Sequence, residues 1–270
     1  MPTVLLTGVA GGIARYLVPE LLAHGYRIRG FDLKAAPYPE VETVIGDIRN
    51  FDEVRAATDG VDVVCHLAAI PSDALPMPQL FPINVTGTAH VLEAAHQCGV
   101  HRVVHASSIR AYGLIAPKNP VRPAFLPITE EHPALSAEGY GMTKAAADTL
   151  ARCYSLRGLS VIVLRPGGVI DFAKGRGGEW NPLDAGVHGP DVAQAFRLAL
   201  ETRREFGIYN VVSMHRYNRQ GRPQTPEERQ AELESLAIGP DICEPEFWSG
   251  KGNVYAIDRI RRELGYQPTW

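Results

Sequence analysis

Short apolar runs alternate with longer segments of helical periodicity through residues 1–165. Most of the runs are continuously apolar rather than alternating, which is typical of strands in a parallel sheet covered on both faces. They occupy residues 4–6, 27–31, 41–45, 61–67, 103–106 and 161–164. Segments of helical spacing lie between them, at residues 13–23, 51–58, 84–97 and 140–154. This alternation predicts right-handed crossovers and an α/β fold with a doubly wound parallel sheet.

The pattern changes after residue 165. Residues 167–189 are rich in glycine and charge and predict an irregular loop. Further elements are expected as a helix at 190–202, a strand at 208–212, a helix from a capping box at Thr225 to about Leu236, and a short helix within 254–264 that ends at Gly265. We therefore expect a larger domain at 1–165 and a small C-terminal substrate-side region at 166–270, some of whose elements return to the core.

Composition and charge argue against several classes of partner and cofactor. The chain has 270 residues and a formal net charge of −3, so nothing favours nucleic acid or an anionic membrane as a partner. Its four cysteines form no Cys-x-x-Cys pair, which favours thiols in a reducing compartment over disulfides or a zinc site. The nine histidines show no metal-ligand spacing, so we predict no metal. The first residues lack a basic segment followed by a long apolar stretch, so we expect a soluble, cytoplasmic protein.

A glycine-rich turn directly follows the first apolar run. Gly8 lets the chain turn tightly out of the strand, and Gly11 allows the backbone to approach a pyrophosphate. The helix that begins near Gly12 and Ile13 offers free N–H groups and the positive end of its dipole to the same group. The turn therefore predicts a dinucleotide site in the domain at 1–165.

Further cofactor candidates follow the next strands. Asp32 ends the second predicted strand, where a carboxylate accepts hydrogen bonds from the adenosine ribose hydroxyls and repels a 2′-phosphate. We therefore predict NAD rather than NADP; the alternative for Asp32 is an ordinary loop carboxylate. The other candidates are Asp47 for the adenine amine, Ile48 beside it, and Leu67, Ala68 and Ala69, where small residues let a cofactor lie against the backbone. Simple strand termination is the alternative explanation for these residues.

Tyr140 and Lys144 are spaced to share one face of a helix. A free phenol titrates near pH 10, which is too high for a base at neutral pH. A nearby ammonium and the positively charged nicotinamide of an oxidised cofactor both favour the phenolate, so the pair is typical of proton transfer coupled to hydride transfer. Ser108 follows the fifth predicted strand, and its hydroxyl can hydrogen-bond the reacting oxygen of a substrate.

With these motifs in place, the chain resembles the extended short-chain dehydrogenase/reductases of the NAD-dependent epimerase/dehydratase family, which have a Rossmann fold. The matching motifs, in the family's order, are Thr7-Gly8-x-x-Gly11, His66-Leu67-Ala68-Ala69, Asn84-Val85-x-Gly87-Thr88, Ser107-Ser108-x-x-x-Tyr112-Gly113, Tyr140-x-x-x-Lys144, Arg165-Pro166 and Leu264-Gly265-Tyr266-x-Pro268. The resemblance implies that Tyr140 is the base, that Lys144 also binds the nicotinamide ribose, and that Ser108 orients the substrate. It also implies that Asn84 and Pro166 lie near the cofactor. Finally, it implies a homodimer formed through helices 84–97 and 140–154.

Three departures from the family's pattern narrow the reaction. No Asp-Glu pair stands in the segment of Ser108, Ile109 and Arg110, which argues against the dehydratases. Gly167-Gly168 follows Arg165-Pro166 where nucleotide-sugar enzymes carry Asn, and few residues separate this point from Asp191. A substrate-covering segment this short implies a small substrate without a nucleotide. The chain thus resembles uronate dehydrogenases, although those tend to have Asn-His where Ile109-Arg110 stands here.

Arg110 and Arg176 are the candidates for binding a substrate carboxylate, because a guanidinium binds such a group in a bidentate pair. The alternative for Arg110 is a solvated loop charge. The remaining residues assigned to the substrate are Ser72, Ser108, Ile109, Tyr140 and Gly167. The basic segment 213–222 contains His215, Arg216, Arg219 and Arg222, which would either bind phosphate or form a solvated loop.

The hypothesis from the sequence is an NAD-dependent oxidoreductase that acts on a sugar hydroxyl or hemiacetal, with a free uronate or aldose as the first substrate class. An epimerase that retains its NAD and returns hydride to the other face is the alternative enzyme. A regulator that senses NAD without turnover is the alternative from another class, and the presence of Tyr140 argues against it.

Overall fold

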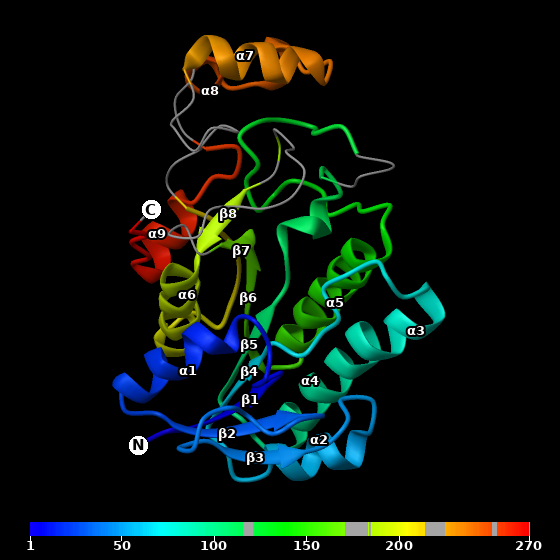
Figure 1. The fold of residues 1–270 in the computed structure, drawn as a ribbon, viewed down its shortest axis with the longest axis vertical. Coiled ribbons are helices and arrows are strands. Elements are labelled where there is room, and N and C mark those ends of the chain that lie inside the picture. Colours follow the sequence, from blue (N-terminus) through cyan, green and yellow to red (C-terminus); the bar gives the residue numbers. More distant parts are fainter. Residues whose placement is uncertain (116–120, 171–182, 184, 214–224, 250–252, 270) are drawn as a thin grey trace.

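A seven-stranded, fully parallel sheet forms the centre of the protein (Figure 1). The structure is a computed structural model that describes residues 1–115, 121–170, 183, 185–213, 225–249 and 253–269. The strands lie in the order β3-β2-β1-β4-β5-β6-β9, which reverses direction between β1 and β4. Their bounds are β1 Thr3–Thr7, β2 Arg27–Asp32, β3 Glu42–Ile45, β4 Val63–His66, β5 Arg102–Ala106, β6 Ser160–Pro166 and β9 Phe206–Val211. The predicted doubly wound Rossmann fold is confirmed.

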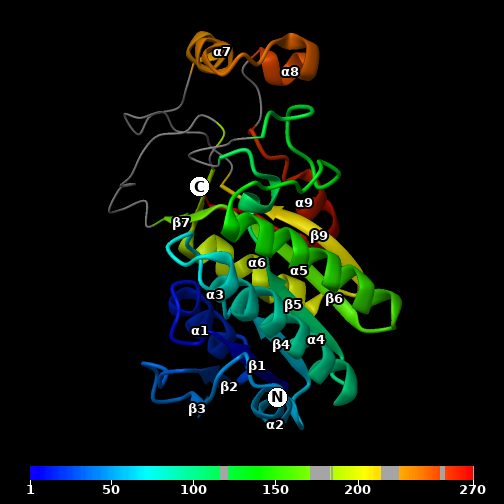
Figure 2. The same cartoon turned by 90° about the vertical axis from the view of Figure 1, so that its right-hand side faces the viewer.

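Helices cover both faces of this sheet. They are α1 Ala14–Ala23, α2 Phe51–Thr58, α3 Met77–Phe81, α4 Gly87–Gln97, α5 Gly139–Leu156, α6 Gly189–Glu201 and α9 Asp258–Leu264. On one face α1 packs against α6; on the other, α4 lies beside α2 and α5 (Figure 2). Successive residues of β1 serve different cores, because Val4 and Leu6 pack with the α1–α6 layer whereas Leu5 packs with the α2–α4–α5 layer. A strand buried on both faces requires the continuous apolar runs seen in the sequence.

The C-terminal part of the chain contributes to the same sheet. Strand β9 extends it by parallel pairing with β6, from Val161 opposite Phe206 to Pro166 opposite Val211. The division into domains at 1–165 and 166–270 stays a prediction.

A small helical unit lies beyond the sheet (Figures 1 and 2). It contains α7 Pro226–Ser235, a short 3-10 turn Pro240–Ile242 and α8 Pro245–Trp248. The predicted capping box at Thr225 is present, with the Thr225 side chain and Glu228 capping each other's backbone N–H groups. Bridges from Leu126 to Cys243 and from Ile128 to Tyr255 tie the segments flanking α8 to the body of the protein.

Two sequence predictions need correction, and a third is confirmed. Residues 167–189 are not wholly irregular, because β7 Gly168–Ile170 pairs in parallel with β8 Gly186–His188; strands of three residues are too short to give a hydrophobic pattern. The helix expected from residue 84 begins with a π-helical segment, η1 Pro82–Thr86, and only then continues as α4. The short helix expected within 254–264 is present as α9, and its C-cap is the predicted Gly265, in the left-handed conformation.

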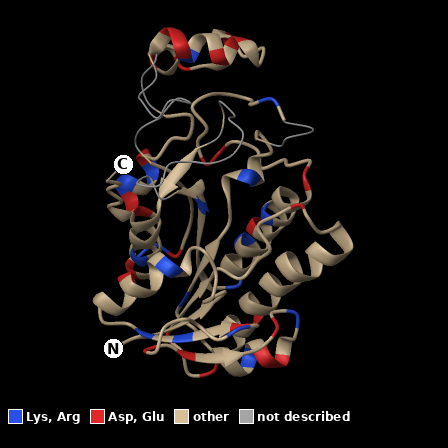
Figure 3. Ribbon diagram, viewed as in Figure 1, with Lys and Arg blue, Asp and Glu red and all other residues tan. Residues whose placement is uncertain are grey.

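Charged side chains of both signs are mixed over the ribbon (Figure 3). In the part of the chain that the structure describes, no helix is long and apolar enough to cross a membrane.

Candidate active site

A pocket of about 750 Å³ opens where the strands end at their carboxyl edge. Most of the residues predicted from the sequence line it together: Gly8, Gly11, Gly12, Ile13, Asp32, Asp47, Ile48, Leu67, Ala68, Ala69, Ser108, Ile109, Arg110, Tyr140, Lys144, Pro166 and Gly167. The pocket lies at the reversal in strand order between β1 and β4, which is where doubly wound sheets bind ligands.

The glycine turn forms the floor of the pocket. Gly8 has a φ of 74°, and a Cβ at this position would lie 2.7 Å from the backbone nitrogen of Ala68. Gly11 donates its N–H to the carbonyl of Gly8 at 2.9 Å, so the turn closes on itself. Helix α1 follows with neither a side-chain cap nor an acidic residue in its first turn. Its positive end therefore faces the pocket with no acidic side chain of its own first turn to neutralise it.

Two carboxylates lie at the β2–β3 end of the pocket. Asp32 accepts hydrogen bonds from the backbone of Ala10 at 3.1 Å and of Lys34 at 3.2 Å, so it is fixed beside the glycine turn. Asp47 is held differently, because the Arg49 side chain donates to both of its oxygens and lowers the pKa of the carboxyl group. An adenine amine at Asp47 would have to share an acceptor with Arg49.

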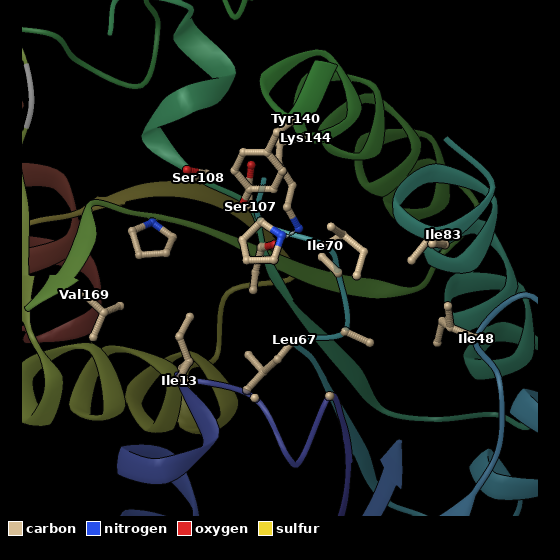
Figure 4. Close-up of a pocket in the computed structure, with 18 of the residues that line it drawn as sticks. Ile13, Ile48, Leu67, Ile70, Ile83, Ser107, Ser108, Tyr140, Lys144 and Val169 are labelled. Carbon is tan, nitrogen blue, oxygen red and sulfur yellow. Dashed lines mark hydrogen bonds between the residues drawn. The ribbon is translucent and has the colours of Figure 1, made fainter. Parts of the chain in front are cut away.

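Ser108, Tyr140 and Lys144 converge on one wall of the pocket (Figure 4). Tyr140 is the second residue of α5, and burial raises the pKa of its phenol to about 12, although a hydrogen bond with Ser108 and the charge of Arg110 both lower it. The ammonium of Lys144 lies 5.8 Å from the centre of the Tyr140 ring and donates to the carbonyl of Ala106 at 2.7 Å. Burial lowers the pKa of Lys144 to about 8. The phenol thus stays protonated at neutral pH unless a further positive charge enters the pocket.

A buried ion pair lies behind Lys144. Asp148 is one helical turn beyond Lys144 on α5, and it accepts hydrogen bonds from Nε and Nη2 of Arg165 at 2.9 Å. Its charge raises the pKa of Lys144 and so opposes the effect of burial. The sequence prediction missed Asp148, although its spacing of four from Lys144 placed it on the same helix face.

Two neutral histidines complete this buried region. The rings of His66 and His105 stack with their centres 5.4 Å apart, and burial together with the charge of Lys144 lowers the pKa of both. They remain uncharged beneath the pocket, so Lys144 is the only cation among these three side chains.

Several other lining residues are apolar. Ile70 and Pro71 follow β4, Ile115 follows the 3-10 helix η2 Ile109–Tyr112, and Val169 lies on β7 (Figure 4). Asn84 does not line the pocket, because it is buried in η1 and hydrogen-bonds both the N–H and the carbonyl of Ile70. Asn84 therefore fixes the loop after β4, which carries Ile70 and Pro71. Ser72 is also outside the lining, on an exposed turn.

Arg110 has partners that the sequence did not suggest. Its guanidinium forms a bidentate pair with Glu138 and lies 3.3 Å from Asp73. Both carboxylates are distant in sequence, so no local pattern could have indicated them. Other predicted basic residues, namely Arg176, His215, Arg216, Arg219 and Arg222, lie outside the described residues.

The model of the NAD dependent epimerase/dehydratase family matches residues 4–170. The chain is 34% identical over 179 residues to "Sterol demethylase protein B" of Methylococcus capsulatus, which covers 62% of this chain and 52% of that protein. It is 29% identical over 168 residues to "Uronate dehydrogenase" of Pseudomonas syringae pv. tomato, covering 60% of this chain and 58% of that one. The chain thus spans about half the length of these curated relatives.

Among solved structures, a short-chain dehydrogenase/reductase superfamily protein from Agrobacterium tumefaciens with bound NAD is 26% identical to this chain. The match covers 99% of this chain and 93% of that one, with a TM-score of 0.73.

Proposed function

The chain belongs to the NAD dependent epimerase/dehydratase family, and from this premise we propose that it oxidises a sugar hydroxyl or hemiacetal with NAD. The observation that carries the proposal is the convergence of Ser108, Tyr140 and Lys144 on one wall of the pocket whose floor is the glycine turn. The family and the fold are those of NAD-dependent oxidoreductases and epimerases; the substrate and the roles of individual residues are our proposal.

The residues of the pocket fit NAD. A Cβ on Gly8 or Gly11 would overlap protein backbone, so only glycine allows this tight turn, and the uncapped end of α1 that follows it suits the pyrophosphate. Asp32 would accept hydrogen bonds from the adenosine ribose. When bound, the nicotinamide supplies the hydride acceptor and a positive charge.

The chemical work of the protein is to position the substrate oxygen and remove its proton. Ser108 would hydrogen-bond that oxygen, and Tyr140 Oη would take the proton. Lys144 would favour the phenolate form of Tyr140 by its charge. The reacting C–OH group would become a carbonyl as its hydroxyl proton passes to Tyr140 and the hydride on its carbon passes to the bound cofactor. Burial is the main cause that raises the pKa of Tyr140 to about 12, even with the charge of Arg110 nearby, so the phenolate would depend on the further positive charges of Lys144 and the oxidised cofactor.

A free uronate or aldose is the proposed substrate class. The similarity to a uronate dehydrogenase supports it, as does the small interval between Gly167-Gly168 and α6. The family also contains epimerases, which return the hydride to the substrate rather than releasing reduced cofactor. A homodimer through α4 and α5 and a cytoplasmic location stay predictions.

The direct test is the near-ultraviolet absorbance of NADH, followed with purified protein, excess NAD and a panel of free uronates and aldoses. We expect sustained NADH accumulation with one substrate class. If no member of the panel gives NADH, the dehydrogenase proposal fails. Isomerisation of a nucleotide sugar without net NADH would instead support the epimerase.

Replacing Asp32 with alanine should shift the cofactor preference from NAD toward NADP. A charge-assisted hydrogen bond contributes roughly 1.5–3 kcal/mol, so we expect KM for NAD to rise about tenfold or more. Loss of the negative charge also removes the repulsion of a 2′-phosphate, so kcat/KM for NADP should rise. Asp32→Asn is the control, since it keeps an acceptor but removes the charge. An unchanged ratio of the two cofactors in Asp32→Ala would rule out this role.

A further inference from the structure

None of three charged residues at the edge of the pocket contacts the substrate oxygen or takes its proton in the proposed chemistry. Asp73 lies on the turn between β4 and α3, Arg110 lies on η2 two residues after Ser108, and Glu138 is the N-cap residue of α5. Each residue belongs to a segment that lines the pocket. Asp73 lies on the loop that carries Ile70, and Arg110 and Glu138 lie two residues from Ser108 and Tyr140. Their side chains meet at one point, so they join these segments to one another.

Asp73 caps the helix that carries Tyr140. Its Oδ1 accepts the backbone N–H of Tyr140 at 2.6 Å, across 67 positions in the sequence. Glu138 makes no side-chain cap hydrogen bond of its own, although it occupies the N-cap position. Residues at a helix N-terminus need an acceptor for their free N–H groups, and a carboxylate there also interacts favourably with the helix dipole. The turn after β4 therefore holds the first turn of α5.

Arg110 joins the other two residues. It pairs with Glu138 through Nε and Nη2, and Nη2 also lies 3.3 Å from Asp73 Oδ2. The Glu138 side chain is only 9% exposed, so its charge needs the guanidinium close by. The backbone N–H of Arg110 donates to the Ser108 hydroxyl at 3.1 Å. A shift of Arg110 would thus move the serine that contacts the substrate.

The seam between η2 and α5 has little room for adjustment. A Cβ built on Gly141, the residue after Tyr140, would overlap the carbonyl oxygen of Arg110 and the hydroxyl of Ser136. Only glycine lets the helix approach the turn this closely. The ion pairs of Arg110 thus lie next to this close contact between η2 and α5. The contact and the ion pairs together fix the separation between Ser108 and Tyr140.

We propose that Asp73, Arg110 and Glu138 form a positioning clamp for the Ser108–Tyr140 pair, and that Arg110 does not bind a substrate carboxylate. This inference rests on the proposed function. It also bears on substrate choice, because a guanidinium paired with two protein carboxylates leaves the discrimination between aldose and uronate to other residues.

The clamp also sets the charge around Tyr140. Arg110 lowers the pKa of the phenol, whereas Glu138 and Asp148 raise it; Ser108 and Lys144 are its other polar neighbours, and His66 and His105 are neutral. Removing Arg110 should therefore raise the pKa of the base and move the acid limb of the kcat profile to higher pH. Removing the Glu138 charge should move it to lower pH.

The first test compares Arg110→Met with wild-type protein on matched uronates and aldoses. We expect kcat to fall about 10- to 100-fold for both classes, since small displacements of reacting groups cost rates of this order, with KM nearly unchanged. Arg197→Met is the matched control, because Arg197 also bridges two carboxylates, Glu20 and Glu201, but lies far from the pocket on α6. A rise in KM confined to uronates, with kcat retained, would overturn the clamp and make Arg110 a carboxylate site.

Two further measurements separate positioning from general stability. Asp73→Ala should lower kcat while Asp73→Asn, which keeps an acceptor for the Tyr140 N–H, restores most of it. Arg110→Met and Glu138→Gln should shift the acid limb in opposite directions, which a loss of folded protein cannot do. Shifts in the same direction, or equal activity of the two Asp73 variants, would contradict the proposal.

Hydrogen exchange supplies a test that needs no substrate. The peptide covering residues 138–143 should exchange faster in Asp73→Ala than in wild-type protein or Asp73→Asn. If none of the substrates in the panel lets the wild-type protein reduce NAD, the proposed function fails. The hydrogen-exchange result still decides whether Asp73 holds the helix. Unchanged exchange in Asp73→Ala would overturn the clamp.

Discussion

Replacing Tyr140 with phenylalanine should lower kcat at least about a hundredfold, the lower end of what a positioned general base contributes. The substitution removes one oxygen from a side chain that is 8% exposed and leaves its ring in place. No other described group next to Ser108 is placed to take the proton: Lys144 is directed to the carbonyl of Ala106, and burial lowers the pKa of both buried histidines, which makes them poor proton acceptors.

The measurement is steady-state NADH formation with the substrate that the panel identifies, alongside NAD affinity by calorimetry. NAD affinity should change little, because the glycine turn and Asp32 are untouched. Ser108→Ala is the companion variant, and its loss should be smaller because a serine hydroxyl orients the oxygen without accepting the proton. A loss of less than a hundredfold in Tyr140→Phe would exclude Tyr140 as the base. If NAD binding and biological activity both survived intact, an NAD-sensing regulator would be favoured over an enzyme.

The main site residues could be predicted because the fold brings them together. Gly8, Ala68 and Ser108 each follow a parallel strand, and parallel strands present their carboxyl ends at one edge of the sheet. Recognising the strands was therefore enough to place these residues near one another. Tyr140 and Lys144 were linked by helical spacing alone.

The supporting residues were not predictable in the same way. Asp73 contacts Tyr140 across 67 positions, and its turn has no periodic pattern that could indicate the contact. Glu138 belongs to none of the sequence motifs, and its partner Arg110 lies 28 positions earlier. Such pairings depend on how loops fold over the sheet, which hydrophobic periodicity does not report. Asp148 is the exception, because its spacing from Lys144 carried the information.

Arg110 shows how this limit affects a functional hypothesis. The sequence left two alternatives open, a ligand for a substrate carboxylate and a solvated charge. The structure shows a half-buried guanidinium paired with two protein carboxylates, which neither alternative describes. A basic residue in a pocket is evidence for an anionic ligand only when the acidic residues around it are known.

Replacing Lys144 with methionine should produce a protein that is nearly inactive and more stable at neutral pH. The loss of kcat should be about a hundredfold or more, comparable to removing a group that stabilises charge developing in the transition state. Without the ammonium, the phenolate of Tyr140 loses a nearby positive charge, so the acid limb of the pH profile should also move to higher pH.

The gain in stability follows from the burial of Lys144. Burial lowers its pKa to about 8, whereas an unfolded lysine titrates near 10.4. Between these values the unfolded chain binds more protons than the folded one, so wild-type stability rises with pH across this window and the full penalty applies below pH 8. Methionine has no such penalty. The unfolding free energy of Lys144→Met should exceed that of the wild-type protein by at most about 3 kcal/mol at pH 7, and this excess should shrink toward pH 10.4. Loss of the hydrogen bond to Ala106 and of a counter-charge for Asp148 will reduce it.

Urea unfolding of the cofactor-free protein at pH 7 and at pH 10 measures this difference directly. Lys34→Met is the control, because Lys34 is exposed and its removal should change stability little at either pH. If Lys144→Met were instead less stable at pH 7, the attraction between Lys144 and Asp148 would outweigh the burial of the ammonium. Lys144 would then be part of the structural support of the core. The expected result, lost activity with gained stability, would mean that the protein tolerates a destabilising buried cation because proton removal at Tyr140 requires it.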